Sequence, residues 1–134
     1  MTIRNMDNYV AALWDWSCFN DCFGNSRIRV SDLDGIVERN GKFLVLEVKS
    51  HGASVPIGQQ RMFNAMAETG AFTVVVLFGE TNAPQRMRVT TRHNGRVVSV
   101  EKPADMDTVR DMVKRWFDFA NSFTKTHRSV DTTC

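Results

Sequence analysis

The chain has 134 residues, of which 43% are apolar and 24% charged, and its formal net charge is +2. This length and composition are typical of one globular domain with its own core, and they exclude a disordered chain, a collagen-like chain and a disulfide-stapled miniprotein. Residues 1–80 carry seven Lys/Arg against nine Asp/Glu, whereas residues 81–134 carry ten against six. Acidic side chains therefore gather in the first part of the chain and basic ones in the second.

The sequence features that bear on cellular location predict a cytoplasmic protein. The start of the sequence has no basic-then-apolar signal layout, and no apolar run approaches the roughly 20 residues that a membrane span requires. Three cysteines, Cys18, Cys22 and Cys134, are an odd number in a chain long enough to fold without disulfides, which favours free thiols in a reducing compartment. Cys18 and Cys22 lack a second Cys/His pair to complete a zinc site, so we expect them to be buried.

The first predicted elements are a helix and a hairpin. Apolar residues recur at helical spacing from Asp7 onward, and the turn formers that begin at Gly24 end this helix. Two β-rich runs within residues 27–50 then flank the pair Asn40-Gly41. An Asn-Gly pair between apolar runs is the strongest short-range hairpin signal, because both residues tolerate the positive φ of a type I′ turn.

The remaining elements complete an α-β-β-α-β-β-β-α order. Ser54 is expected to cap a second helix, with Pro56 in its first turn and Gly70 after its end. A continuous apolar strand follows over 71–79, then a second hairpin over 86–101 that turns at Asn94-Gly95, and a last helix over 104–123. We expect a single α/β domain over 1–124, built as a mixed sheet flanked by helices, and a polar, loose tail over 125–134.

The register of the first hairpin brings acidic residues together. Counting outward from the turn, Asp34 lies opposite Glu47 and Asp32 lies opposite Lys49, and side-chain alternation puts all four on one face. Directly opposed Cβ atoms lie roughly 4.5–5.5 Å apart, and two carboxylates at that distance repel unless a cation lies between them. Ligands made only of carboxylate oxygen suit Mg²⁺ or Mn²⁺. The alternative is a solvated polar face of the ribbon.

The run "DGIVERNGKFLVLEVK", in which Asp34-Gly35 is followed after eleven residues by Glu47-Val48-Lys49, resembles the PD-(D/E)xK (restriction-endonuclease-like) nuclease superfamily. It is most similar to small stand-alone phage and prophage nucleases. The resemblance covers roughly residues 7–79 and implies the α-β-β-α-β core of that superfamily. It implies that Asp34 is the first motif acid, Glu47 the second acid and Lys49 the motif lysine; Leu33 stands where a proline is common.

Two further positions follow from the resemblance. Members often carry a glutamine on the next helix, which is Gln60 here, with Gln59 as the competing choice. Many members also use an acid from the first helix, and nothing in the sequence selects between Asp15 and Asp21.

The implied activity is Mg²⁺-dependent (or Mn²⁺-dependent) hydrolysis of DNA, in phage or prophage recombination, repair or processing. Asp34 and Glu47, with a backbone carbonyl near Val48, are expected to hold one or two ions. Lys49 is expected to orient the attacking water or to neutralise charge that grows on the phosphate. Asp32 is expected to hold Lys49, with a plain cross-strand ion pair as the alternative.

The second hairpin is the candidate DNA contact. Arg86, Arg88 and Arg92 share one face of the ribbon and are expected to bind phosphates, whereas the alternative is a charged edge that prevents aggregation. His51 follows the Glu-x-Lys strand and is a further candidate phosphate contact or general base. A homodimer is expected only if the substrate is a junction or a double-strand site. The rival function is a non-catalytic nucleic-acid-binding or inhibitor protein on a nuclease-like scaffold.

Overall fold

The computed structural model describes residues 14–123. The chain divides into two compact units, Met1–Asp32 and Leu33–Cys134, and each is described by itself. The predicted domain end at residue 124 and the predicted tail over 125–134 lie outside the described residues.

The described part of the first unit contains one short helix, η1 (Trp16–Cys22), which is a 3₁₀-helix. Residues 7–13 of the predicted α-helix lie outside the described residues, and the α-helical prediction is wrong for the part that follows. The Asp15 side chain accepts a hydrogen bond from the Ser17 N–H (3.0 Å) and so caps the start of η1. This hydrogen bond also lowers the pKa of the Asp15 carboxyl.

The cysteines of this helix are exposed. Cys18 and Cys22 are both free thiols, and η1 has no buried residue. The expectation that they are buried is therefore wrong, because within residues 14–32 nothing covers this helix of seven residues.

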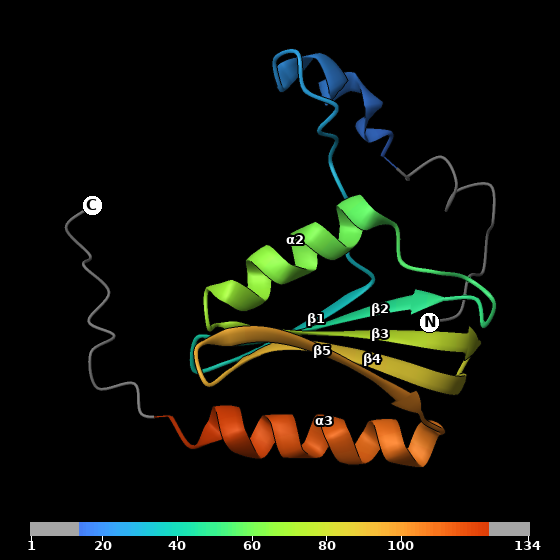
Figure 1. Ribbon diagram of the computed structural model, residues 1–134, viewed down its shortest axis with the longest axis vertical. Helices are drawn as coiled ribbons and strands as arrows, with labels where there is room; N and C mark the ends of the chain where they lie inside the picture. Colours follow the sequence, from blue (N-terminus) through green and yellow to red (C-terminus); the bar gives the residue numbers. More distant parts are fainter. Residues whose placement is uncertain (1–13, 124–134) are drawn as a thin grey trace. The chain divides into compact units, whose positions relative to one another are not determined.

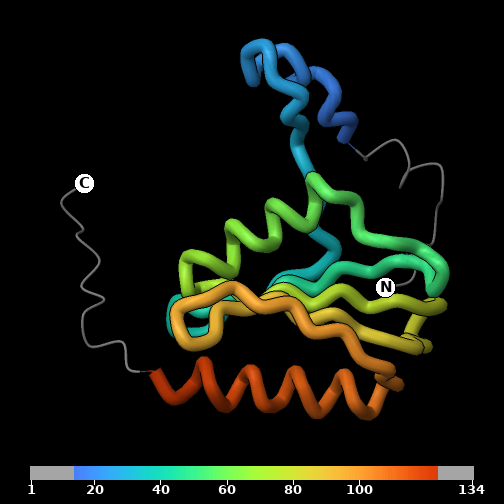
Figure 2. The backbone as a smooth tube through the Cα atoms, in the orientation of Figure 1, coloured from blue at the N-terminus to red at the C-terminus, as the bar shows by residue number. Residues whose placement is uncertain are grey.

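The second unit is a five-stranded sheet with one helix on each face (Figure 1). The strands lie in the order β1 (Gly35–Arg39), β2 (Lys42–Lys49), β3 (Phe72–Glu80), β4 (Ala83–His93) and β5 (Arg96–Pro103). Strands β2 and β3 are parallel, and every other neighbouring pair is antiparallel. The crossover between the parallel strands is α2 (Ile57–Glu68), and α3 (Met106–Asn121) follows β5. The tube in Figure 2 shows α2 and α3 on opposite sides of the sheet. The predicted mixed α/β class is confirmed.

Both predicted Asn-Gly turns are confirmed. Asn40 and Gly41 have φ of 53° and 79°, and Asn94 and Gly95 have φ of 51° and 77°. These positive values match the type I′ turn, whose twist fits the right-handed twist of the strands. The first hairpin keeps the predicted register from Arg39↔Lys42 to Gly35↔Leu46.

Side-chain alternation divides the core into two layers. On the α2 face of the sheet, Phe63 of the helix packs with four buried strand residues, Val45, Val74, Val76 and Phe78. On the α3 face, the helix residues Val109, Met112, Trp116 and Ala120 pack with Leu44, Val75 and Met87. Neighbours along β2 therefore face opposite layers, so Glu47 and Lys49 lie on the same face as Val45.

Two predicted ends differ from the structure. α2 has Pro56 as its N-cap residue and no side-chain cap, so the predicted Ser54 cap is wrong. Pro56 is extended (ψ 146°), so the first helical residue is Ile57, and Ser54 lies two residues before the N-cap position. The last helix, predicted from residue 104, begins at Met106. Its N-cap is Asp105, whose carboxylate accepts hydrogen bonds from the Thr108 N–H and hydroxyl.

Candidate active site

Asp34 and Glu47 lie side by side where the first hairpin opens. Asp34 immediately precedes β1, whose first pair is Gly35↔Leu46, so continuing the register by one residue places Asp34 opposite Glu47. The Asp34 N–H donates to Glu47 Oε1 (3.0 Å), and the Val48 N–H donates to Asp34 Oδ2 (2.9 Å). Each carboxylate therefore accepts one backbone N–H from the other strand. These reciprocal bonds fix the two acids beside each other at one end of the hairpin.

The two carboxylates have different surroundings. Glu47 is only 4% exposed, whereas Asp34 is exposed. Glu47 Oε2 also accepts a hydrogen bond from Gln59 Nε2 (3.0 Å) in the first turn of α2. The Oε1 atom of the same amide is buried and has no hydrogen-bond partner in the described part of the chain. An unsatisfied oxygen acceptor thus lies next to a buried carboxylate.

The glutamine that hydrogen-bonds Glu47 is Gln59, the competing choice of the sequence, and not Gln60. Gln60 donates to Asn64 Oδ1 (2.9 Å) and accepts from Arg88 Nη1 (3.0 Å), so it faces β4. Successive residues of an α-helix point about 100° apart. The two glutamines therefore contact different strands, and only the helix rotation decides which one meets the hairpin.

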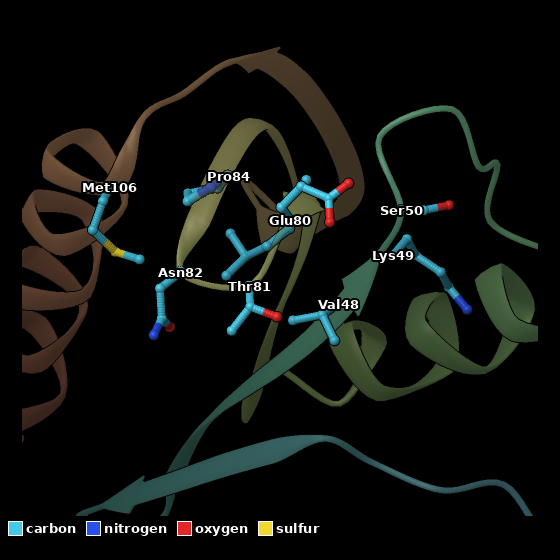
Figure 3. A pocket seen from close by; sticks show the side chains of 10 residues that line it. Val48, Lys49, Ser50, Glu80, Thr81, Asn82, Pro84 and Met106 are labelled. Carbon is cyan, nitrogen blue, oxygen red and sulfur yellow. The ribbon is translucent and has the colours of Figure 1, made fainter. Parts of the chain in front are cut away.

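Lys49 is the last residue of β2 and lies on the same face as Glu47. Its side chain is half-buried, and within residues 14–123 it forms no ion pair. Figure 3 shows its side chain extending away from the other labelled residues of a neighbouring pocket. The structure thus leaves one ammonium group unpaired on the face that holds the two acids.

The predicted role of Asp32 loses its geometric basis. The ladder ends at Gly35↔Leu46, so Asp32 precedes the strand on which its position opposite Lys49 depended. Its carboxylate accepts a hydrogen bond from the indole Nε1 of Trp16 (2.8 Å) instead. Asp15 and Asp21 belong to the same unit as Asp32, and Asp15 is used as the cap of η1.

The predicted phosphate-binding arginines are engaged with other groups of the protein. Arg86, Arg88 and Arg92 share one face of β4, as alternation predicts. Arg86 and Arg88 both pair with Glu101 of β5. Arg92 donates to the Glu68 carbonyl at the end of α2 (3.3 Å). Arg86 also donates to the carbonyl of His51 (2.9 Å), whose side chain is exposed.

A cavity of about 400 Å³ opens at the carboxyl ends of the parallel strands β2 and β3 (Figure 3). Its lining includes Val48, Leu77 and Glu80 from the strands, Asn82 from the turn between β3 and β4, and Met106 from α3. Val48 and Met106 line the cavity from the α3 side, whereas Lys49, which shares a face with Glu47, also lines it. The crevice at the carboxyl ends of parallel strands is where open α/β sheets bind ligands.

The donor atoms at the acid pair fit a hard divalent cation. Within residues 14–123 no three His, Cys, Asp or Glu side chains converge as a metal group. The oxygens present are those of two opposed carboxylates, with the unpaired Oε1 on the Gln59 amide that contacts Glu47, and Mg²⁺ is commonly bound by one or two carboxylates with water completing its shell. Gln60, three residues before Phe63, does face the sheet, but it meets β4, whereas Gln59 meets β2.

No family model, curated protein or solved structure matches the chain. In the described part of the chain, no helix is long and apolar enough to cross a membrane.

Proposed function

We propose that the chain is a divalent-metal-dependent nuclease that hydrolyses DNA phosphodiester bonds, with Asp34, Glu47 and Lys49 as its central residues. The observation that carries the proposal is the opposed carboxylate pair, one member of which is buried, with an unpaired amide oxygen beside it. Like-charged groups this close are destabilising without a cation, so a fold that retains them favours a metal-binding role.

The residues divide the chemistry between them. Asp34 and Glu47 hold the Mg²⁺ or Mn²⁺, and Gln59 Oε1 is a further candidate oxygen ligand. When bound, the metal polarises the phosphate and lowers the pKa of a coordinated water. Lys49 lies on the same face and is placed to stabilise negative charge that develops on the phosphate. Gln59 Nε2 orients the Glu47 carboxylate through its hydrogen bond.

The resemblance of the hairpin motif to the PD-(D/E)xK superfamily supports the same activity and a restriction-endonuclease-like core. The mixed sheet with its β1–β2 hairpin, crossover helix and parallel β3 is compatible with that core. DNA as the partner, a cytoplasmic location and action on phage or prophage DNA belong to this proposal as well.

One observation favours the rival function, a non-catalytic nucleic-acid-binding or inhibitor protein. Both carboxylates accept backbone N–H groups without a cation. Their arrangement therefore has a structural explanation in the hairpin itself, and a scaffold that has lost its activity keeps the same contacts.

Calorimetric titration with Mn²⁺, followed by cleavage assays, separates the two functions. The substrates are supercoiled, linear, single-stranded and branched DNA, and RNA, each with Mg²⁺ or Mn²⁺. We expect the parent protein to bind Mn²⁺ and to cut at least one DNA, and Glu47→Gln to do neither. Asp111→Asn, which removes an acid from α3, is the matched control and should behave as the parent.

The two glutamines provide a second matched pair. Gln59→Leu should weaken Mn²⁺ binding and Gln60→Leu should not, because only Gln59 contacts Glu47. A parent protein that binds Mn²⁺ but cuts no nucleic acid supports the rival function. A parent protein that does not bind Mn²⁺ overturns the metal site.

A further inference from the structure

Two arginines of β4 converge on one carboxylate. Arg86 Nη1 lies 2.8 Å from Glu101 Oε2, and Arg88 Nη2 lies 3.0 Å from Glu101 Oε1. Arg88 Nε donates to the same Oε1 (3.1 Å). These are the only ion pairs within residues 14–123. The triad of Arg86, Arg88 and Glu101 has a net charge of +1. Two guanidinium groups around one oxyanion form the arrangement that binds phosphate in proteins.

The triad is held in place on one side and open on the other. Arg86 stacks on the Phe78 ring (3.6 Å to the centroid) and donates to the carbonyls of His51 and Ala53. Arg88 Nη1 donates to Gln60 of α2. The side chains of Arg86 and Arg88 are 24% and 27% exposed, whereas that of Glu101 is 37% exposed. The arginines are therefore anchored, and the carboxylate is the member nearest to solvent.

The triad lies on the same face of the sheet as the acid pair. Across the strands, Glu47 neighbours Val76, Val76 neighbours Arg88 and Arg88 neighbours Glu101. Arg88 is thus two strands from Glu47, about 10 Å at the usual strand spacing. Measured along the axis of a DNA duplex, that distance corresponds to about three base-pair steps.

We propose that Arg86 and Arg88 form a phosphate-binding site that Glu101 occupies when no ligand is bound, so that a phosphate of the DNA backbone binds by displacing this carboxylate. DNA as the source of the phosphate rests on the proposed nuclease function. Glu101 is the most exposed member of the triad, and ion pairs in contact with solvent contribute little to stability, so its displacement costs little. A phosphodiester presents two non-bridging anionic oxygens, as the carboxylate does, so it can take the place of Glu101 Oε1 and Oε2 between the two guanidinium groups.

Metal-free binding of a labelled DNA duplex tests this proposal without reference to cleavage. Glu101→Gln removes the internal competitor, and we expect it to tighten binding about 2- to 30-fold, the range for one or two exposed ion pairs. Arg88→Gln should weaken binding and reduce the log–log salt slope by about 0.9. Asp111→Asn makes the same charge change on α3, on the other side of the sheet, and is the matched control. Binding by Glu101→Gln that is no tighter than that of Asp111→Asn overturns the proposal.

Titration of the parent protein with inorganic phosphate decides the question even if a variant fails to fold. We expect saturable shifts of the Arg86 and Arg88 Nε–H signals in nuclear magnetic resonance spectra, and unshifted signals overturn the site. Shifts with phosphate but not with the duplex overturn DNA as the ligand. If Glu101→Gln tightens DNA binding in a protein that neither binds Mn²⁺ nor cuts DNA, the nuclease function fails while the phosphate site stands.

Discussion

Lys49 and Glu47 are two residues apart on one face of β2, yet their substitutions should have different consequences. Lys49→Met keeps the aliphatic part of the side chain and removes the ammonium group, which is not a metal ligand. We expect cleavage to fall by roughly 10²–10³, typical for the loss of one group that stabilises transition-state charge, with Mn²⁺ affinity nearly unchanged. Cleavage rates and calorimetry on the same preparation check both parts. Undiminished cleavage by Lys49→Met removes the lysine from the mechanism.

The buried carboxylate should cost stability when no metal is present. In Glu47→Gln, one like charge is removed from beside Asp34, and the new amide N–H₂ meets Gln59 Oε1 once the Gln59 amide turns over. The turned amide then places its own N–H₂ at the buried position of the former oxygen, so the expected gain comes from the removed like charge. We expect the free energy of unfolding to rise by about 1 kcal/mol in metal-free buffer. Denaturant unfolding with a chelator present measures it, and a clear loss of stability contradicts the account of the acid pair.

At the scale of the elements, the turn from β3 to β4 depends on Gly79. Its φ is 154°, and a Cβ there collides with the Ala83 carbonyl oxygen and lies 2.8 Å from Pro84 Cα. We expect Gly79→Ala to lower the free energy of unfolding by about 2–3 kcal/mol. Gly58→Ala is the control, because its Cβ meets nothing within 4 Å and α2 gains up to about 1 kcal/mol. Equal unfolding midpoints for the two variants would argue against the β3–β4 geometry.

The cap of α3 makes stability depend on pH. The Thr108 N–H and hydroxyl bonds lower the pKa of Asp105 below its ordinary value of 3.8. A lowered folded-state pKa contributes stability above the ordinary pKa, and this contribution is lost as the pH falls through the folded-state value. Asp105→Ala should therefore lower the melting temperature at neutral pH and converge with the parent in strong acid. Asp107→Ala, in the same helical turn, is the comparison and should show a smaller difference at neutral pH.

The sequence predicts this level of structure well where the signals are local. The Asn40-Gly41 turn determines the β1–β2 register and with it the meeting of Asp34 and Glu47. Counting back from Asn94-Gly95 likewise pairs Arg88 with Glu101. The prediction that the arginines of this hairpin bind phosphate considered only the face they share, and it missed this pair. Such turns fix pairing because side-chain direction has a period of two.

The errors arise where position depends on tertiary packing. The choice between Gln59 and Gln60 depends on how Phe63 seats α2 on the sheet, which spacing alone does not determine. Asp32 was placed by extending the ladder beyond Gly35, where β1 begins. Pairing partners determine a strand's end, and residue preference does not.

At the scale of the whole molecule, the second unit contains what its own folding requires. The five strands, α2, α3 and both hydrophobic clusters lie within residues 33–123. We expect a chain of residues 30–134, which keeps a short lead before Leu33, to unfold in one cooperative transition. Circular dichroism and thermal melting compare it with the full chain. A non-cooperative melt shows that residues 1–29 complete the core.

The same shortened chain tests whether an acid of the first unit joins the candidate site. Asp34, Glu47, Gln59 and Lys49 all belong to the second unit, so we expect Mn²⁺ affinity within about threefold of the full chain, less than one tenfold step of 1.4 kcal/mol. A folded, shortened chain that loses Mn²⁺ binding shows that residues 1–29 supply a ligand. Asp15→Asn and Asp21→Asn in the full chain then identify which acid it is. If Mn²⁺ binding persists and cleavage is lost, those residues act on the nucleic acid and not on the metal.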